Sequence, residues 1–116
     1  MAILVVDDEL LINSITSDDL RSVGYEVVSA YNADEAIGIL EDRGDIDTLL
    51  TDIDMQGKMD GLGLAAAVHD RWPPVHIIIT SGKAEPQGSE MPQDSRFISK
   101  PWLVRDVLDV IRSFGN

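Results

Sequence analysis

Three aspartates of this sequence follow apolar runs of strand length. Asp7 and Asp8 come directly after the run ILVV, and Asp52 ends the run LLTD. Three carboxylates held close together repel one another, so at least one would have a raised pKa without a compensating charge. A divalent cation that prefers hard oxygen ligands, such as Mg²⁺, removes this repulsion. These residues therefore predict a Mg²⁺ site that keeps Asp52 ionised and nucleophilic.

A hydroxyl and an ammonium group follow two later apolar runs. Thr80 ends the run IIIT, and Lys100 follows FIS and precedes a proline. A lysine can bind a phosphoryl oxygen as a point charge, and a threonine hydroxyl can donate a hydrogen bond to another. Phosphoryl transfer depends mainly on positioning and charge stabilisation. With Asp52 as nucleophile, the set is complete for forming an acyl phosphate on a carboxylate.

Each of these residues has an ordinary alternative interpretation when taken alone. Asp52 could be a turn residue, and Asp8 could cap a following helix. Thr80 could be an end-of-strand hydroxyl, and Lys100 a solvated surface lysine. Their occurrence at successive strand ends favours the chemical interpretation, because the carboxyl ends of parallel strands meet at one edge of an open α/β sheet.

The elements that would position these residues alternate along the chain without a linker or repeat. Strand-like and helix-like segments alternate five times, which predicts an α/β fold with a doubly wound, five-stranded parallel sheet. The strands are expected at 3–6, 25–30, 46–51, 75–80 and 97–98. The first expected helix includes Leu11, Ile15, Leu20 and Val23, and the second begins near Asn32. The third ends near His69, and the last ends before Gly115.

The segment from Gly82 to Ser95 departs from this pattern. It contains two prolines and two glycines and has little helical periodicity. A helix normally fills the crossover between parallel strands. We therefore expect the fourth helix to be weak, short or irregular.

Composition limits the classes of function. The 116 residues suit a single domain over 1–116, and 44% hydrophobic residues are enough for a core. The net charge of −12 argues against nucleic-acid binding and against anionic lipid, and favours cations or basic partners. Cysteine is absent, and the apolar runs are too short for a signal peptide or membrane span. We expect a soluble, cytoplasmic protein.

Four stretches of the sequence resemble the receiver domain of two-component response regulators. They are ILVVDDE, LLTDIDMQGKMDG, IIITSG and FISKP, and the spacing between them also fits. The resemblance covers the whole chain and implies a flavodoxin-like sheet with strand order 2-1-3-4-5. It also implies a signalling switch rather than an enzyme with a separate substrate.

The resemblance assigns a role to each acidic residue of the motif. Asp52 would be the phosphoacceptor, which receives its phosphoryl group from a phosphohistidine of a sensor histidine kinase or phosphotransfer protein. Asp7 and Asp8 would bind Mg²⁺, with Asp8 the expected direct ligand. The backbone carbonyl of Asp54 would complete the metal site. We further hypothesise that the Asp54 carboxylate tunes the lifetime of the phosphoryl group by repelling it or by orienting a hydrolytic water.

The resemblance also assigns the residues that would respond to phosphorylation. Lys100 would bind the phosphoryl group, and the Lys100–Pro101 peptide bond is expected to be cis. Thr80 would be the switch hydroxyl, and Phe97 stands where the family has an aromatic switch residue. The response would be movement of the loop after Thr80 toward the phosphate.

Three departures from the usual family pattern accompany these matches. Gln56 replaces a common proline, the following loop is one residue longer through Gly57 and Lys58, and the crossover after Thr80 is short. The last two traits resemble stand-alone receivers of alphaproteobacteria. We expect no output domain after Asn116, so the protein would act by protein contact or as a phosphate sink. A receiver excised from a hybrid kinase fits equally well.

Two other functions are possible on this sequence. Asp52-Ile53-Asp54 after a strand is similar to the motif of aspartate-nucleophile phosphohydrolases of the haloacid dehalogenase type. The motif of those enzymes has Thr or Val at the position of Gln56. An activity of that type would also leave the presence of Asp7 and Asp8 unexplained. The other alternative is a phosphorylation-independent binding module on the same fold, against which the complete set of acidic, hydroxyl and lysine residues argues.

Overall fold

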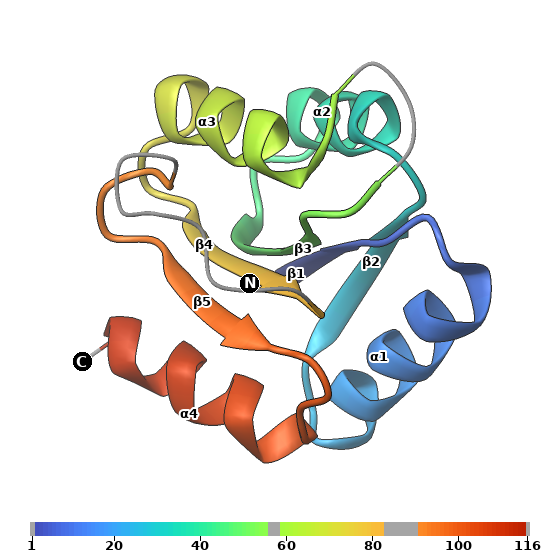
Figure 1. Cartoon of the computed structure of the whole chain (residues 1–116). Coiled ribbons are helices and arrows are strands. Elements are labelled where there is room, and N and C mark those ends of the chain that lie inside the picture. The colour runs from blue at the N-terminus through green and yellow to red at the C-terminus, as the bar shows by residue number, and fades with distance from the viewer. Residues whose placement is uncertain (1, 56–58, 83–90, 116) are drawn as a thin grey trace.

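The chain forms a five-stranded parallel sheet with helices on both faces (Figure 1). A computed structural model describes residues 2–55, 59–82 and 91–115. The strand order β2-β1-β3-β4-β5 confirms the predicted flavodoxin-like topology. The elements in chain order are β1 (Ala2–Val6), α1 (Leu10–Ser22), β2 (Glu26–Ala30), α2 (Ala33–Asp42), β3 (Ile46–Asp52), α3 (Gly61–Arg71), β4 (His76–Ser81), β5 (Arg96–Ser99) and α4 (Val104–Gly115).

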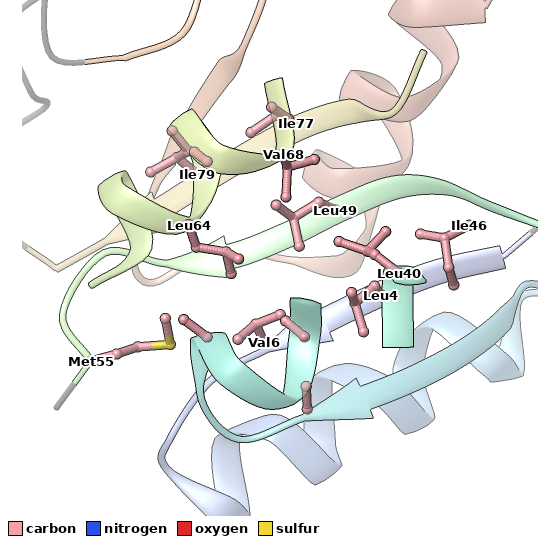
Figure 2. Close-up of a cluster of buried hydrophobic side chains, with 14 of the residues drawn as sticks. Leu4, Val6, Leu40, Ile46, Leu49, Met55, Leu64, Val68, Ile77 and Ile79 are labelled. Carbon is pink, nitrogen blue, oxygen red and sulfur yellow. The ribbon is translucent and has the colours of Figure 1, made fainter. Parts of the chain in front are cut away.

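Two apolar layers hold the helices against the sheet. Figure 1 shows α2 and α3 on one face, and α1 and α4 on the other. Because side chains alternate along a strand, Leu4 and Val6 of β1 point to the α2–α3 layer (Figure 2), whereas Ile3 and Val5 belong to the α1–α4 layer. Every residue of β1 is buried, as expected for a central parallel strand.

The predicted start of the second helix is confirmed in detail. Asn32 is the N-cap of α2, and its side-chain oxygen accepts a hydrogen bond from the Glu35 backbone N–H at 2.8 Å. The Glu35 carboxylate in turn accepts from the Tyr31 N–H at 2.7 Å. The first contact satisfies a backbone donor that the first turn of a helix leaves without a partner. The second ties the residue before the N-cap to that turn.

The predicted boundaries differ from the observed ones by one or two residues. The third helix extends beyond His69 to Arg71, because the first residue that cannot continue it is Pro73. The last strand is longer than predicted, since Arg96 and Ser99 also pair with β4. The weak fourth helix expected between 82 and 95, and the longer loop at Gly57 and Lys58, fall mainly or wholly outside the described residues.

The first helix has the predicted position but not the face that its apolar spacing suggests. Leu11 and Ile15, which lie near helical spacing with Leu20, are 71% and 49% exposed. Small polar residues of α1 instead face the sheet, and Asn13 and Ser17 are almost completely buried. The first half of α1 therefore exposes apolar side chains, while part of the inner face of the helix is polar.

Candidate functional site

The ends of β1 and β3 bring two aspartates to one edge of the sheet. Asp7 and Asp52 are only 6% and 4% exposed. The β3–β4 register aligns Asp52 with Thr80, which is also buried. Asp52 is two residues after Leu50, and Thr80 is two after Ile78. All four side chains therefore point toward the α1–α4 layer, as the alternation along a strand requires.

Lys100 connects the two aspartates. Its Nζ lies 2.9 Å from Asp52 Oδ2 and 3.7 Å from Asp7 Oδ2. The Lys100 backbone N–H donates to the Ser81 carbonyl at 2.9 Å, and the bond to Pro101 is cis, as predicted. Burial acts to lower the pKa of Lys100, but the hydrogen bond to Asp52 and the surrounding carboxylates outweigh it and raise the pKa. The ammonium is therefore charged at neutral pH.

Asp7, Glu9 and Asp52 place carboxylate oxygens within 4.8 Å of one another. The Glu9 backbone N–H also donates to Asp7 Oδ1 at 2.9 Å. Three carboxylates beside one ammonium leave an excess of negative charge, which fits a receiver metal site. Asp8 is not a member of this group. Glu9 was not singled out from the sequence, and its only signal was its place in the run DDE.

The electrostatic cost of this cluster is visible at Asp7. Burial raises the pKa of Asp7, although the hydrogen bond from Glu9 N–H and the charge of Lys100 act in the opposite direction. The charges of Asp52 and Glu9 add to the increase. A divalent cation bound between these groups would favour their ionised forms.

Asp54 is hydrogen-bonded to Asp52 on one side and to β4 on the other. Its backbone N–H donates to Asp52 Oδ1 at 3.2 Å. Its carboxylate accepts from Ser81 Oγ at 2.9 Å. Ser81 is buried, so it holds this carboxylate beside the loop that follows Asp52. The contact with Ser81 was not anticipated, because sequence spacing does not reveal which side chains meet across two strand ends.

Gly61 is a further positioning residue that the sequence did not identify. A Cβ at this position would lie 2.0 Å from the Asp52 carbonyl oxygen. The Gly61 N–H donates to the Ile53 carbonyl at 3.0 Å. The first residue of α3 therefore has to be a glycine for the helix to approach the end of β3 so closely.

The two predicted switch residues lie on different faces of the sheet. Thr80 lines a cavity of about 480 Å³ together with Asp7, Asp52 and Lys100. Phe97 pairs with Ile79 in the β4–β5 register and packs against the α2–α3 layer. The sheet therefore lies between the side chains of Thr80 and Phe97.

The sequence and the fold both match known receiver domains. The family model described as response regulator receiver domain matches residues 3–112. A putative response regulator, NtrX-like, from Rickettsia bellii is 36% identical over 81 residues, which is 69% of this chain and 17% of that protein. The chain thus spans about 17% of the length of such curated relatives.

Solved structures agree with this assignment. The response regulator receiver domain protein (CheY-like) from Methanospirillum hungatei JF-1 has 30% identity and a TM-score of 0.85, over 97% of this chain and 91% of that one. The response regulator TrrA from Thermotoga maritima in complex with Mg²⁺-BeF has 25% identity and a TM-score of 0.86, over 97% and 98%. This chain belongs to the response regulator receiver domain family of two-component systems. Within the described ranges, no helix has the length and apolar character of a membrane span.

Proposed function

We propose that Asp52 accepts a phosphoryl group from a phosphohistidine of a sensor histidine kinase or phosphotransfer protein. The observation that carries this proposal is the buried Asp52 carboxylate, bonded to Lys100 and grouped with two further carboxylates at the edge of the sheet. An isolated structural aspartate would not need two acidic neighbours that raise its electrostatic cost. The setting is the cytoplasm, which the absence of cysteine fits.

Apart from the phosphohistidine donor, the reaction needs only this site and Mg²⁺. An Asp52 carboxylate oxygen attacks phosphorus, the phosphorus–nitrogen bond of the phosphohistidine breaks, and its electron pair remains on the imidazole. Lys100, which is hydrogen-bonded to Asp52 before the reaction, would then neutralise one phosphoryl oxygen. The Thr80 hydroxyl would donate a hydrogen bond to another. Mg²⁺, held by Asp7 and Asp52 with Asp8, Glu9 or the Asp54 carbonyl, would neutralise the remaining phosphoryl charge.

The exposed apolar face of α1 supports transfer from a protein donor. Leu10 and Leu11 are 66% and 71% exposed, and Ile15 is about half exposed. Ile15 also lines the cavity that Asp52 and Lys100 line. Apolar side chains gathered beside a reactive group are typical of a protein-binding surface. A donor that docks on α1 would bring its phosphohistidine to the edge where Asp52 lies.

Phosphorylation would then shift a two-state equilibrium that a partner protein detects. Each charge-assisted hydrogen bond from Thr80 or Lys100 contributes about 1.5–3 kcal/mol. Reversing a 1:99 population takes about 5.5 kcal/mol. Because Lys100 already bonds Asp52, its bond to the phosphoryl group replaces an existing one. The new Thr80 bond would therefore supply at most about half of this free energy. Thr80→Ala should leave phosphorylation of Asp52 largely intact but weaken phosphorylation-dependent partner binding. Unchanged binding would refute the role of Thr80.

The function is tested by incubating wild type and Asp52→Asn with acetyl phosphate, with Mg²⁺ or with a chelator. One phosphoryl group per chain should appear by mass spectrometry only in wild type with Mg²⁺. Phosphorylation of the Asp52→Asn variant would contradict the proposal. Sustained turnover of p-nitrophenyl phosphate would instead support a phosphohydrolase, because a switch forms a single stoichiometric adduct.

A further inference from the structure

A buried polar cluster lies directly behind Asp7, between α1 and the sheet. Asn13 is fully buried, and its Nδ2 donates to the carbonyl oxygens of Asp7 at 3.0 Å and Ala30 at 2.8 Å. Its Oδ1 accepts from Ser17 Oγ at 3.2 Å, and Ser17 Oγ lies 2.8 Å from Ser29 Oγ. A chain of buried side-chain hydrogen bonds thus runs from the end of β1 through α1 to β2.

The Asn13 amide uses both of its N–H donors on the ends of β1 and β2. Both N–H donors point to carbonyl oxygens, and these contacts fix which end of the amide is the nitrogen. The Ala30 carbonyl also accepts from the Asp7 N–H at 3.2 Å, so Asn13 and Asp7 share one acceptor. An apolar side chain at this place would fill the space but would leave two buried carbonyls with fewer partners.

Asn13 also has two hydrogen bonds to the turn that precedes it. Its backbone N–H donates to the Glu9 carbonyl at 2.9 Å, while its side chain holds the Asp7 carbonyl. The bond to Glu9 is the ordinary helical hydrogen bond that any residue at position 13 would make, so only the contacts with Asp7 and Ala30 depend on the asparagine side chain. With the Asp7 carbonyl turned toward α1, the Asp7 carboxylate lies toward Lys100 and the Glu9 N–H.

We propose that Asn13 is a positioning residue that sets the Asp7 carboxylate for Mg²⁺ binding, and through Mg²⁺ the reactivity of Asp52. The inference rests on the proposed function, because it takes Mg²⁺ as the ion of the acidic cluster. Replacing a residue that orients a metal ligand typically lowers the metal affinity about 10–100-fold. This role explains why the polar residue Asn13 is buried on the inner face of α1.

Ser17 supplies a matched control. It lies one turn further along α1, is as buried as Asn13 and belongs to the same cluster. Within the described residues, however, its side-chain hydrogen bonds reach only Asn13 and Ser29. If Asn13 only stabilised the fold, Asn13→Ala and Ser17→Ala would change the same properties. If Asn13 positions the Asp7 carboxylate, only replacement of Asn13 should change the Mg²⁺ affinity at a temperature where both variants are folded.

The test measures the Mg²⁺ dissociation constant by calorimetry for wild type, Asn13→Ala, Asn13→Ser and Ser17→Ala, beside their Tm values. Asn13→Ala should weaken Mg²⁺ binding about tenfold or more. Asn13→Ser, which keeps one donor, should lie between it and wild type. Ser17→Ala should lower Tm but keep the Mg²⁺ affinity within about twofold. With acetyl phosphate, Asn13→Ala should need more Mg²⁺ for half-maximal rate, and saturating Mg²⁺ should restore most of the rate.

Each other outcome has a defined meaning. Equal Mg²⁺ affinity in Asn13→Ala and wild type overturns the inference and leaves the proposed function intact. An equal loss in Asn13→Ala and Ser17→Ala also overturns it, as does failure of both Asn13 variants to fold while Ser17→Ala folds. Absence of Mg²⁺ binding in wild type overturns the proposed function itself.

Discussion

The two edges of the sheet each hold one basic side chain among carboxylates, but in opposite settings. At the carboxyl edge, Lys100 lies beside Asp7 and Asp52, which are both buried. At the amino edge, Arg43 joins two exposed carboxylates at the starts of β2 and β3. The first cluster has more negative charge than its lysine can compensate and little water to screen it. The second is solvated and has no reactive group beside it.

The pKa values of two aspartates, one at each edge, are shifted in opposite directions. At the amino edge, the hydrogen bond from Arg43 lowers the pKa of Asp45. Arg43 also bonds Glu26 at 2.6 Å. At the carboxyl edge, burial raises the pKa of Asp7 despite its neighbouring lysine. Charges at the amino edge thus favour the folded state weakly. At the carboxyl edge, the ionised form of Asp7 is disfavoured, and shifts of this kind are common at functional sites.

The largest effect is expected from removing the basic residue of the carboxyl edge. Lys100→Ala deletes the ammonium that bonds Asp52 and that would stabilise the transferring phosphoryl group. Phosphorylation by acetyl phosphate should slow about 100-fold, the typical loss for one electrostatic contact to a transition state. Lys100→Arg, which keeps the charge, should lose less. A Lys100→Ala rate within threefold of wild type would show that the lysine is only a structural partner of Asp52.

A second prediction concerns how tightly each edge is packed. Gly61→Ala would place a Cβ against the Asp52 carbonyl, so the end of β3 or the start of α3 has to move. The free energy of unfolding should fall by about 2–3 kcal/mol, as in other overpacked sites, in urea denaturation. Gly44→Ala is the control at the amino edge, because a Cβ there meets nothing within 4 Å. Equal stability of the two variants would contradict the close packing at Gly61.

A third prediction separates function from stability at Asp7. Because burial raises its pKa, ionised Asp7 destabilises the folded protein in the absence of Mg²⁺. Asp7→Asn should therefore raise Tm at pH 7 by a few degrees while weakening Mg²⁺ binding. The gain should appear as pH rises through the pKa of folded Asp7 and vanish below pH values near 3.8, where the aspartate is protonated in both states. A lower Tm at pH 7 would show that Asp7 stabilises the fold through Lys100.

The smallest effect is expected at the amino edge. Arg43→Ala removes two exposed ion pairs, and such pairs contribute little to stability. Its Tm should fall by a few degrees at most, less so at high salt, and its phosphorylation rate should be unchanged. A slower phosphorylation would show that the two edges are coupled, which nothing in the contacts of Arg43 suggests.

The sequence was sufficient for the architecture because apolar strands and helix caps are local signals. The cap at Asn32 and the meeting of Asp52 with Lys100 follow from elements that the sequence marks clearly. The strand order was implied by the resemblance to receiver domains and not by local signals. The placement of Glu9 could not be predicted, since adjacent acids in a turn do not reveal which side chain faces the site. The roles of Asn13 and Gly61 depend on contacts between distant segments, which local spacing does not encode.

The most direct test of the central claim is chemical identification of the phosphorylated residue. Wild type would be treated with acetyl phosphate and Mg²⁺, then with borohydride, which reduces an acyl phosphate of aspartate to homoserine. Peptide mass spectrometry should then find homoserine at position 52 and none in a sample without Mg²⁺. Homoserine at another aspartate, or its absence from a sample that has bound Mg²⁺, would contradict the assignment of Asp52 as phosphoacceptor.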